Sequence, residues 1–122
     1  MEFGQLVGAW RLVRARMYTR DGSTSAHMYG PDPNGVLLYT PDGGVSATIE
    51  SASGDIAVCY AGRVTLADET VNHHVLVGEG RFPAGTDLVR HASFDSDEHL
   101  NLAVHHPGGA VRALLVWRRA DA

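Results

Sequence analysis

The sequence has no lysine, and this absence removes several reaction classes. All ten basic residues of the 122 are arginine. Without a side-chain amine there can be no Schiff base with a carbonyl substrate or with pyridoxal phosphate, and no P-loop lysine. The sequence also lacks a Gly-x-Gly-x-x-Gly run and a Gly-x-Ser-x-Gly elbow. Neither dinucleotide binding nor serine hydrolase chemistry is therefore indicated.

Cysteine, long apolar runs and blocks of like charge are also scarce. The single cysteine, Cys59, excludes an intrachain disulfide, and no stretch approaches the ~18 apolar residues of a membrane span. The net charge is -4 without a long block of one sign, which gives nucleic-acid binding little support. The first residues lack the basic start and apolar run of a signal peptide. We therefore expect a soluble, cytoplasmic protein without nucleic-acid or membrane partners.

Turn signals occur at short, even intervals along the chain. "TPDGG" at 40–44 and "FPAGTD" at 82–87, for example, carry the glycine, proline or aspartate that tight turns require. The segments between the turns are rich in valine, leucine, tyrosine and threonine, which is typical of β-strands. The predicted strands are residues 8–17, 25–29, 35–40, 44–50, 55–66, 70–78, 87–94, 98–105 and 110–118. This pattern predicts one all-β domain over residues 1–122, either an up-and-down barrel or a sandwich.

Alternation along the strands predicts which side chains face the interior. In the strand at 70–78 two adjacent histidines must point to opposite faces, and the flanking valines place His73 inside and His74 outside. The full inward set predicted for the last five strands is Ile56, Val58, Tyr60, Val64, Leu66, Val71, His73, Val75, Val77, Leu88, Arg90, Ala92, Phe94, Leu100, Leu102, Val104, Val111, Ala113, Leu115 and Trp117.

Six motifs follow one another along nearly the whole chain. They are "LVGAWRLV" with its Gly-x-Trp, "GPDPNGVLLYTPDGGVSATI", "YAGRVTL", "VNHHVLV", "FPAGTDLVRH" and the closing "LLVWRR". Together they resemble the bacterial lipocalin-like domain family. The resemblance implies a closed, up-and-down antiparallel β-barrel of about eight strands, of the calycin type, with a central cavity. It also implies that Trp10 closes one end of the barrel and that Arg119 stacks on it.

One link departs from the pattern of that family. Its members carry a longer, partly helical insert between the strand of "YTPDGGVS" and the strand of "YAGR", where this chain has only "ESASGD". The resemblance leaves open whether one mouth of the barrel is uncovered or is covered by the partner in a homodimer.

A barrel of this size can hold one small, mainly hydrophobic molecule. The predicted inward set supplies an apolar wall with a few polar exceptions. The residues expected to contact the ligand without taking part in chemistry are Tyr39, Val58, Val71, Val75, Phe94, Leu102 and Leu115.

Three polar side chains on neighbouring strands, Tyr60, His73 and Arg90, are the candidate catalytic groups. His73 is expected near Ala92 or diagonal to Arg90 across the strand pair. A buried histidine beside an arginine has a lowered pKa and is neutral at pH 7, so it could act as a base. Tyr60 could donate a proton, and Arg90 could hold an enolate, phenolate or carboxylate. No cofactor would be needed.

Two functions are compatible with these residues. The first, which the clustering of polar groups favours, is an acid–base enzyme such as a cyclase, isomerase or dehydratase acting on a hydrophobic intermediate of secondary metabolism. The second is a carrier or sequestering protein in which His73 only packs or orients the ligand. A metal site is not favoured, because adjacent histidines split across two faces and three converging ligands are not evident. His74 is left for a cross-strand contact with His91 or for a partner.

Overall fold

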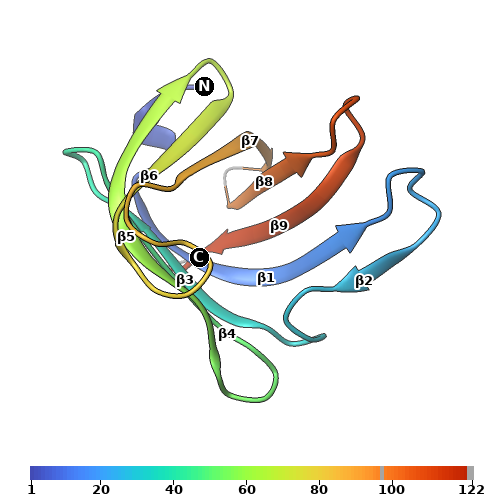
Figure 1. Ribbon diagram of the computed structural model, residues 1–122. Helices are drawn as coiled ribbons and strands as arrows, with labels where there is room; N and C mark the ends of the chain where they lie inside the picture. The colour runs from blue at the N-terminus through green and yellow to red at the C-terminus, as the bar shows by residue number, and fades with distance from the viewer. Residues whose placement is uncertain (97, 121–122) are drawn as a thin grey trace.

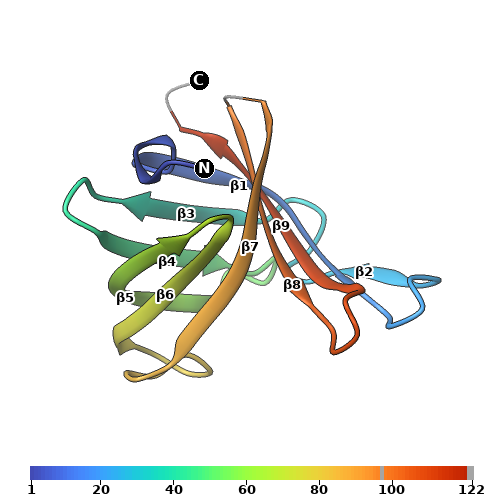
Figure 2. The same cartoon turned by 90° about the horizontal axis from the view of Figure 1, so that it is seen from above.

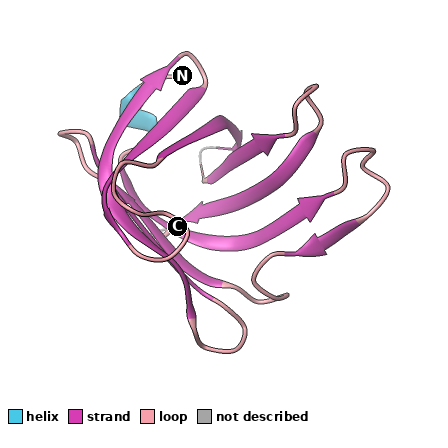
Figure 3. Ribbon diagram, in the orientation of Figure 1, coloured by secondary structure: helices cyan, strands magenta, loops and turns pink. Residues whose placement is uncertain are grey.

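The computed structural model describes residues 1–96 and 98–120. These residues form one short 3₁₀ helix, η1 (Phe3–Gln5), and nine β-strands (Figures 1 and 3). The strands are β1 (Gly8–Tyr18), β2 (Ser25–His27), β3 (Asn34–Tyr39), β4 (Gly44–Glu50), β5 (Ile56–Ala67), β6 (Thr70–Gly78), β7 (Asp87–Ser96), β8 (His99–His105) and β9 (Val111–Arg119). The strands predicted from the sequence agree with these within two residues at each end. In the described residues no helix is long and apolar enough to cross a membrane.

Eight of the strands close into an antiparallel barrel (Figures 1 and 2). Consecutive strands from β3 to β9 pair with one another, and β1 pairs with both β3 and β9. The length of β1 allows this double role, since Gly8–Arg11 pair with β3 while Trp10–Met17 pair with β9. The remaining strand, β2, pairs with the far end of β1. The predicted closed up-and-down barrel is confirmed, and the sandwich is excluded.

The interior of the barrel is filled by large apolar side chains at one end. Trp10, Leu6 and Leu100 are fully buried there, and Leu37, Ile49 and Trp117 are nearly fully buried elsewhere in the interior. Burying a side chain of this size contributes about 1.5–3 kcal/mol. These residues therefore supply much of the free energy that holds the barrel closed.

Three residues predicted to face the interior are exposed instead. The exposed fractions are 54% for Ile56, 64% for Val77 and 37% for Val111. Each lies next to a shift in strand register. The shift beside Ile56 falls opposite Ile49 and Glu50 of β4. Those beside Val77 and Val111 fall opposite Ala61 and Gly62 of β5 and opposite Val104 and His105 of β8. The inward prediction for these three residues is wrong.

The register shifts give the physical reason. At each of them one strand contains an extra residue, which is Ala57 in β5, Leu76 in β6 and Arg112 in β9. An extra residue in one strand reverses the inside–outside alternation beyond it. Simple alternation therefore fails for the residue on the far side of each bulge, and it also misplaces Arg112.

The short link between β4 and β5 is a tight turn. The amide of Ser51 donates to the carbonyl of Asp55 at 2.8 Å, and that of Gly54 donates to the carbonyl of Ser51 at 2.9 Å. The link between β2 and β3 packs against this turn, because a Cβ added at Gly30 would lie 2.7 Å from Cβ of Ala52. Tyr29, beside Gly30, is buried. The β2–β3 link thus occupies part of the barrel mouth near the shortened turn.

Candidate functional site

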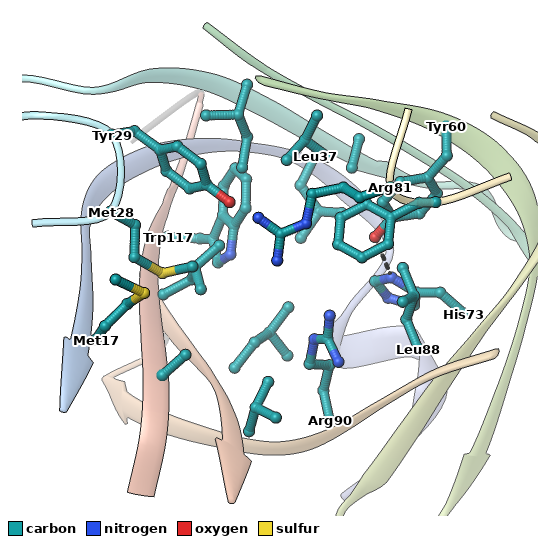
Figure 4. A pocket seen from close by; sticks show the side chains of 18 of the residues that line it. Met17, Met28, Tyr29, Leu37, Tyr60, His73, Arg81, Leu88, Arg90 and Trp117 are labelled. Carbon is teal, nitrogen blue, oxygen red and sulfur yellow. Dashed lines mark hydrogen bonds between the residues drawn. The ribbon is translucent and has the colours of Figure 1, made fainter. Parts of the chain in front are cut away.

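A cavity of about 280 Å³ lies inside the barrel (Figure 4). Every strand of the closed barrel contributes to its wall, and the links before β3 and β7 contribute at its mouth. The lining residues are Met17, Met28, Tyr29, Leu37, Ala47, Ile49, Val58, Tyr60, His73, Arg81, Phe82, Leu88, Arg90, Leu102, Val104, Arg112, Ala113, Leu115 and Trp117. Most of them are apolar, as expected of a pocket for a small molecule.

The charged residues of the cavity wall are all arginines. Arg81, Arg90 and Arg112 line the cavity, and no aspartate or glutamate does so in the described part of the chain. Arg90 lies on β7 and is half-buried, whereas Arg81 and Arg112 are exposed. The chain as a whole is acidic, with a net charge of -4. The cavity is therefore positive within a negative protein.

His73, on β6, is held by two tyrosines. The hydroxyl of Tyr39 lies 2.7 Å from Nε2, and the hydroxyl of Tyr60 lies 2.6 Å from Nδ1. The imidazole is 2% exposed. Burial, followed by the nearby charges of Arg90 and His74, lowers the pKa of His73 to about 3. The ring is therefore neutral at neutral pH, and both of its nitrogens already have hydrogen-bond partners.

The two tyrosines differ in their access to the cavity. Tyr60 lines it, whereas Tyr39 lies in the core behind His73. Burial raises the pKa of Tyr60 to about 12, against the opposing effect of Arg90. Burial also raises the pKa of Tyr39 well above its ordinary value. Both phenols are therefore protonated at neutral pH, and each can donate a hydrogen bond.

Among the described residues, no acid forms an ion pair with Arg90. Its Nη1 donates to the carbonyl of Val89 at 3.1 Å, and burial lowers the pKa of its guanidinium. Arg81 enters the same space from the β6–β7 link and lies 4.9 Å from the ring centroid of Phe82. Burial raises the pKa of Tyr29, and the charges of Arg81 and Arg90 both oppose this rise. These effects and Figure 4 place both guanidiniums toward the same part of the cavity.

Trp117, on β9, adds a further hydrogen-bond donor to the cavity wall. The residue is almost fully buried, and its indole nitrogen has no hydrogen-bond partner in the described structure. A buried donor without a partner is rare in folded proteins. The polar groups of the cavity are thus mostly donors, which suits a ligand with acceptor oxygens.

The opposite end of the interior is sealed by Trp10 and Arg119. The guanidinium of Arg119 lies 4.2 Å from the centroid of the Trp10 ring. It also donates to the carbonyls of Val7 at 3.1 Å and Gln5 at 2.6 Å. The indole of Trp10 donates to the carbonyl of Leu6 at 2.8 Å. These contacts fasten the N-terminal segment over the barrel end.

The family comparison agrees with this architecture. The profile of a family described as a lipocalin-like domain matches residues 7–55, which span β1 to β4. The rest of the described chain completes the same closed eight-stranded barrel. The match and the closed barrel together support a lipocalin-like barrel family. No curated protein matches it. A lipocalin-like barrel with an internal cavity is consistent with small-molecule binding.

The residues predicted to touch a ligand fall into two groups in this lipocalin-like barrel. Val58, Leu102 and Leu115 line the cavity together with Tyr60, His73 and Arg90. Four others are not among the lining residues, and they pack in or against the core: Tyr39, Val71, Val75 and Phe94. Alternation correctly turns these four inward, but it carries no information about depth along the barrel. Phe94, for example, lies 6.2 Å from Trp10, ring centroid to ring centroid, at the closed end.

Three polar lining residues were missed by the sequence reasoning. Arg81 lies in a link between strands, where alternation makes no prediction, and Arg112 is the extra residue of a bulge. Tyr29 was placed at the end of the predicted strand 25–29, but β2 ends at His27 and Tyr29 lies in the link to β3. The predicted neighbours of His73 need one correction. Leu88, rather than Ala92, lies opposite His73 on β7, and Arg90 occupies the predicted diagonal position.

The outer face of β6 also differs from the prediction. Nδ1 of His74 lies 2.6 Å from a carboxylate oxygen of Asp87, and its Nε2 lies 3.0 Å from the hydroxyl of Thr65. His91 lies 3.6 Å from Glu69 instead. The predicted contact between His74 and His91 is therefore wrong, because each histidine has a nearer acidic partner. Within the described residues no group of three or more potential metal ligands converges.

Proposed function

We propose that this lipocalin-like barrel binds a small, largely apolar molecule that carries an acidic group such as a carboxylate, phenolate or enolate. The observation that carries the proposal is the set of three arginines in a mainly apolar cavity whose described wall contains no acid. A buried charge that faces no opposite charge costs free energy, and among the three this cost applies to half-buried Arg90. A ligand anion in the cavity would offset this cost, and the apolar wall would bind the remainder of the ligand.

The three arginines have different parts in this proposal. Arg90 is the least exposed of them and lies diagonal to His73, so it is the group we assign to direct contact with the anion. Arg81 and Arg112 are exposed at the cavity wall. Their charges would attract an anion toward the mouth of the barrel.

Two fluorescent probes with the same ring system provide the test. Anilinonaphthalene sulfonate carries a negative charge, and N-phenylnaphthylamine is its neutral counterpart. We expect the wild-type protein to bind the sulfonate about tenfold or more tightly than the neutral amine, as one charge-assisted hydrogen bond would give. In Arg90→Gln most of this preference should disappear, while the affinity for the neutral amine should change little.

Arg118→Gln is the matched control, because Arg118 is an exposed arginine of β9 that does not line the cavity. It should leave both affinities unchanged. Equal affinity of the wild-type protein for the charged and the neutral probe would contradict the proposal.

Acid–base chemistry on the same class of ligand is a second candidate function. It is favoured by the presence of Tyr60 and Arg90 in one cavity, where they could stabilise an enolate oxygen while solvent water takes the proton from the adjacent carbon, during an isomerisation, cyclisation or dehydration of a hydrophobic metabolite. His73 would act through Tyr60, since both of its ring nitrogens are engaged. Exchange of solvent deuterium into a bound tetralone, lost in Tyr60→Phe, would support catalysis. Binding without exchange would favour a carrier or sequestering protein.

A further inference from the structure

Three buried side chains form a chain of hydrogen bonds that leads from the core to the cavity. Tyr39 lies in the core on β3, His73 is in the middle on β6, and Tyr60 lines the cavity on β5. The hydroxyl of Tyr39 contacts Nε2 of His73 at 2.7 Å, and the hydroxyl of Tyr60 contacts Nδ1 at 2.6 Å. Figure 4 shows the bond between Tyr60 and His73 at the edge of the cavity.

The chemistry of imidazole limits how protons can be arranged along this chain. A neutral histidine has one N–H donor and one unprotonated nitrogen that accepts. One tyrosine must therefore donate to the ring, and the other must accept from it. Only two arrangements are possible, and they differ in which hydroxyl hydrogen is left over.

The two arrangements leave the spare hydrogen in very different places. If Tyr60 donates to Nδ1, then Nε2–H donates to Tyr39, and the spare hydrogen is that of Tyr39. His73 is the single partner found for the Tyr39 hydroxyl among the described residues, so this hydrogen would be buried without an acceptor. If Tyr39 donates to Nε2, the spare hydrogen is that of Tyr60, at the cavity wall. The second arrangement leaves no donor unsatisfied inside the core.

We infer that the hydrogen bonds run in one direction, from Tyr39 to Nε2 of His73 and from Nδ1–H of His73 to Tyr60, so that the Tyr60 hydroxyl donates into the cavity. Tyr60 is then a specificity-determining residue that recognises an acceptor oxygen on the ligand. Tyr39 and His73 are positioning residues that act through Tyr60. The assignment of a ligand oxygen to Tyr60 rests on the proposed function, whereas the direction of the chain does not.

Tyr60 keeps its own proton at neutral pH because burial raises its pKa to about 12. Relay of a proton through the chain is also disfavoured, since replacing a proton lost from Tyr60 by Nδ1–H would require Tyr39 to protonate Nε2. That sequence would leave a phenolate on Tyr39 in the core, where burial strongly disfavours the charged form. Tyr60 therefore suits recognition of an anionic or partially negative oxygen by a hydrogen bond, with Arg90 supplying the compensating charge from the same cavity.

The direction of the chain can be measured without any ligand. In protein labelled with ¹⁵N-histidine, long-range ¹H–¹⁵N correlation spectra distinguish a protonated ring nitrogen from an unprotonated one. The His73 signals are assigned by their loss in His73→Gln. We expect the proton on Nδ1 and none on Nε2. A proton on Nε2 would overturn the inference whatever the protein binds.

The contribution of the chain to binding is tested by a double-mutant cycle with anilinonaphthalene sulfonate. Tyr60→Phe removes the donor and should weaken binding about tenfold. Tyr39 is not part of the cavity wall, but Tyr39→Phe removes the donor that fixes the direction of the hydrogen bonds. The Tyr60 hydroxyl would then donate to the ligand only part of the time, so binding should weaken about threefold. In the double variant the loss should equal that of Tyr60→Phe alone, because Tyr39 acts through Tyr60.

Tyr18→Phe is the control for removing a tyrosine hydroxyl away from this cavity, and it should not change the affinity. Full additivity of the two losses, or an unchanged affinity in Tyr39→Phe, would overturn the positioning role. If the wild-type protein shows no preference for the sulfonate over the neutral probe, the proposed function fails, and the spectra of the ligand-free protein still decide the direction of the chain.

Discussion

The buried imidazole of His73 makes the stability of the protein depend on pH in a defined direction. Folding lowers the pKa of His73 from 6.5 to about 3, so the unfolded chain binds a proton more readily than the folded one between these values. This group therefore leaves the free energy of unfolding at its full value above about pH 6.5. Below that pH it lowers the free energy of unfolding, and the loss grows as the pH falls toward about 3. The slope is about 1.4 kcal/mol per pH unit within this window.

From about pH 7 to about pH 4.5 this single group should lower the free energy of unfolding by about 2.5 kcal/mol. That is a large share of the roughly 5–15 kcal/mol that stabilises a typical domain. Urea unfolding at the two pH values should show the decrease in the wild-type protein. In His73→Gln, whose amide can still donate and accept hydrogen bonds, the decrease should be smaller by this amount. Other titrating groups are common to both chains, so the reasoning is refuted if the two proteins lose the same stability on acidification.

Two further predictions concern the barrel itself, and both are read from urea unfolding. Arg119→Gln should reduce the free energy of unfolding by about 2–3 kcal/mol, because it removes the stack on Trp10 and the hydrogen bonds to the N-terminal carbonyls; a loss no larger than that of exposed Arg118→Gln would contradict this role. Gly62→Ala should cost about 3 kcal/mol, since the new Cβ would lie 1.9 Å from the carbonyl oxygen of His74 and the paired strands must separate. Gly4→Ala, where nothing lies within 4 Å, is the comparison, and similar losses for both would refute the steric explanation.

The order and lengths of the strands could be predicted because each strand has a local signature. Turn residues mark its ends, and the apolar alternation marks its buried face. The predicted bounds of β4 and β6 match the observed ones. The failures at Ile56, Val77 and Val111 have a common cause. A bulge depends on how two strands fit together, and the sequence of one strand does not reveal that one of its own residues has no partner in the neighbouring strand, as for Ala57, Leu76 and Arg112.

Alternation along the strands predicted the central residues of the candidate site, but it could not predict their contacts or the other residues of the cavity wall. His73 lies on a strand whose valines define the inner face, and Tyr60 and Arg90 follow from alternation on the adjacent strands. The contact between Tyr60 and His73 could not be derived from register. Tyr60 pairs with Gly78, five residues beyond His73, and its long side chain spans the difference. Contacts that depend on side-chain reach, or on depth in the barrel, require the three-dimensional structure.

The three arginines that make the cavity positive reach it in three different ways. Arg90 faces inward by the regular alternation of β7, Arg112 lines the cavity as the extra residue of a bulge, and Arg81 enters from a link. Without the bulge in β9, regular alternation would turn Arg112 outward. Desolvating a guanidinium is unfavourable unless something compensates it. This cost applies to half-buried Arg90, whereas Arg81 and Arg112 are exposed and add positive charge beside it without adding an acid to the described wall. A ligand that brings a negative charge is the simplest explanation for this arrangement.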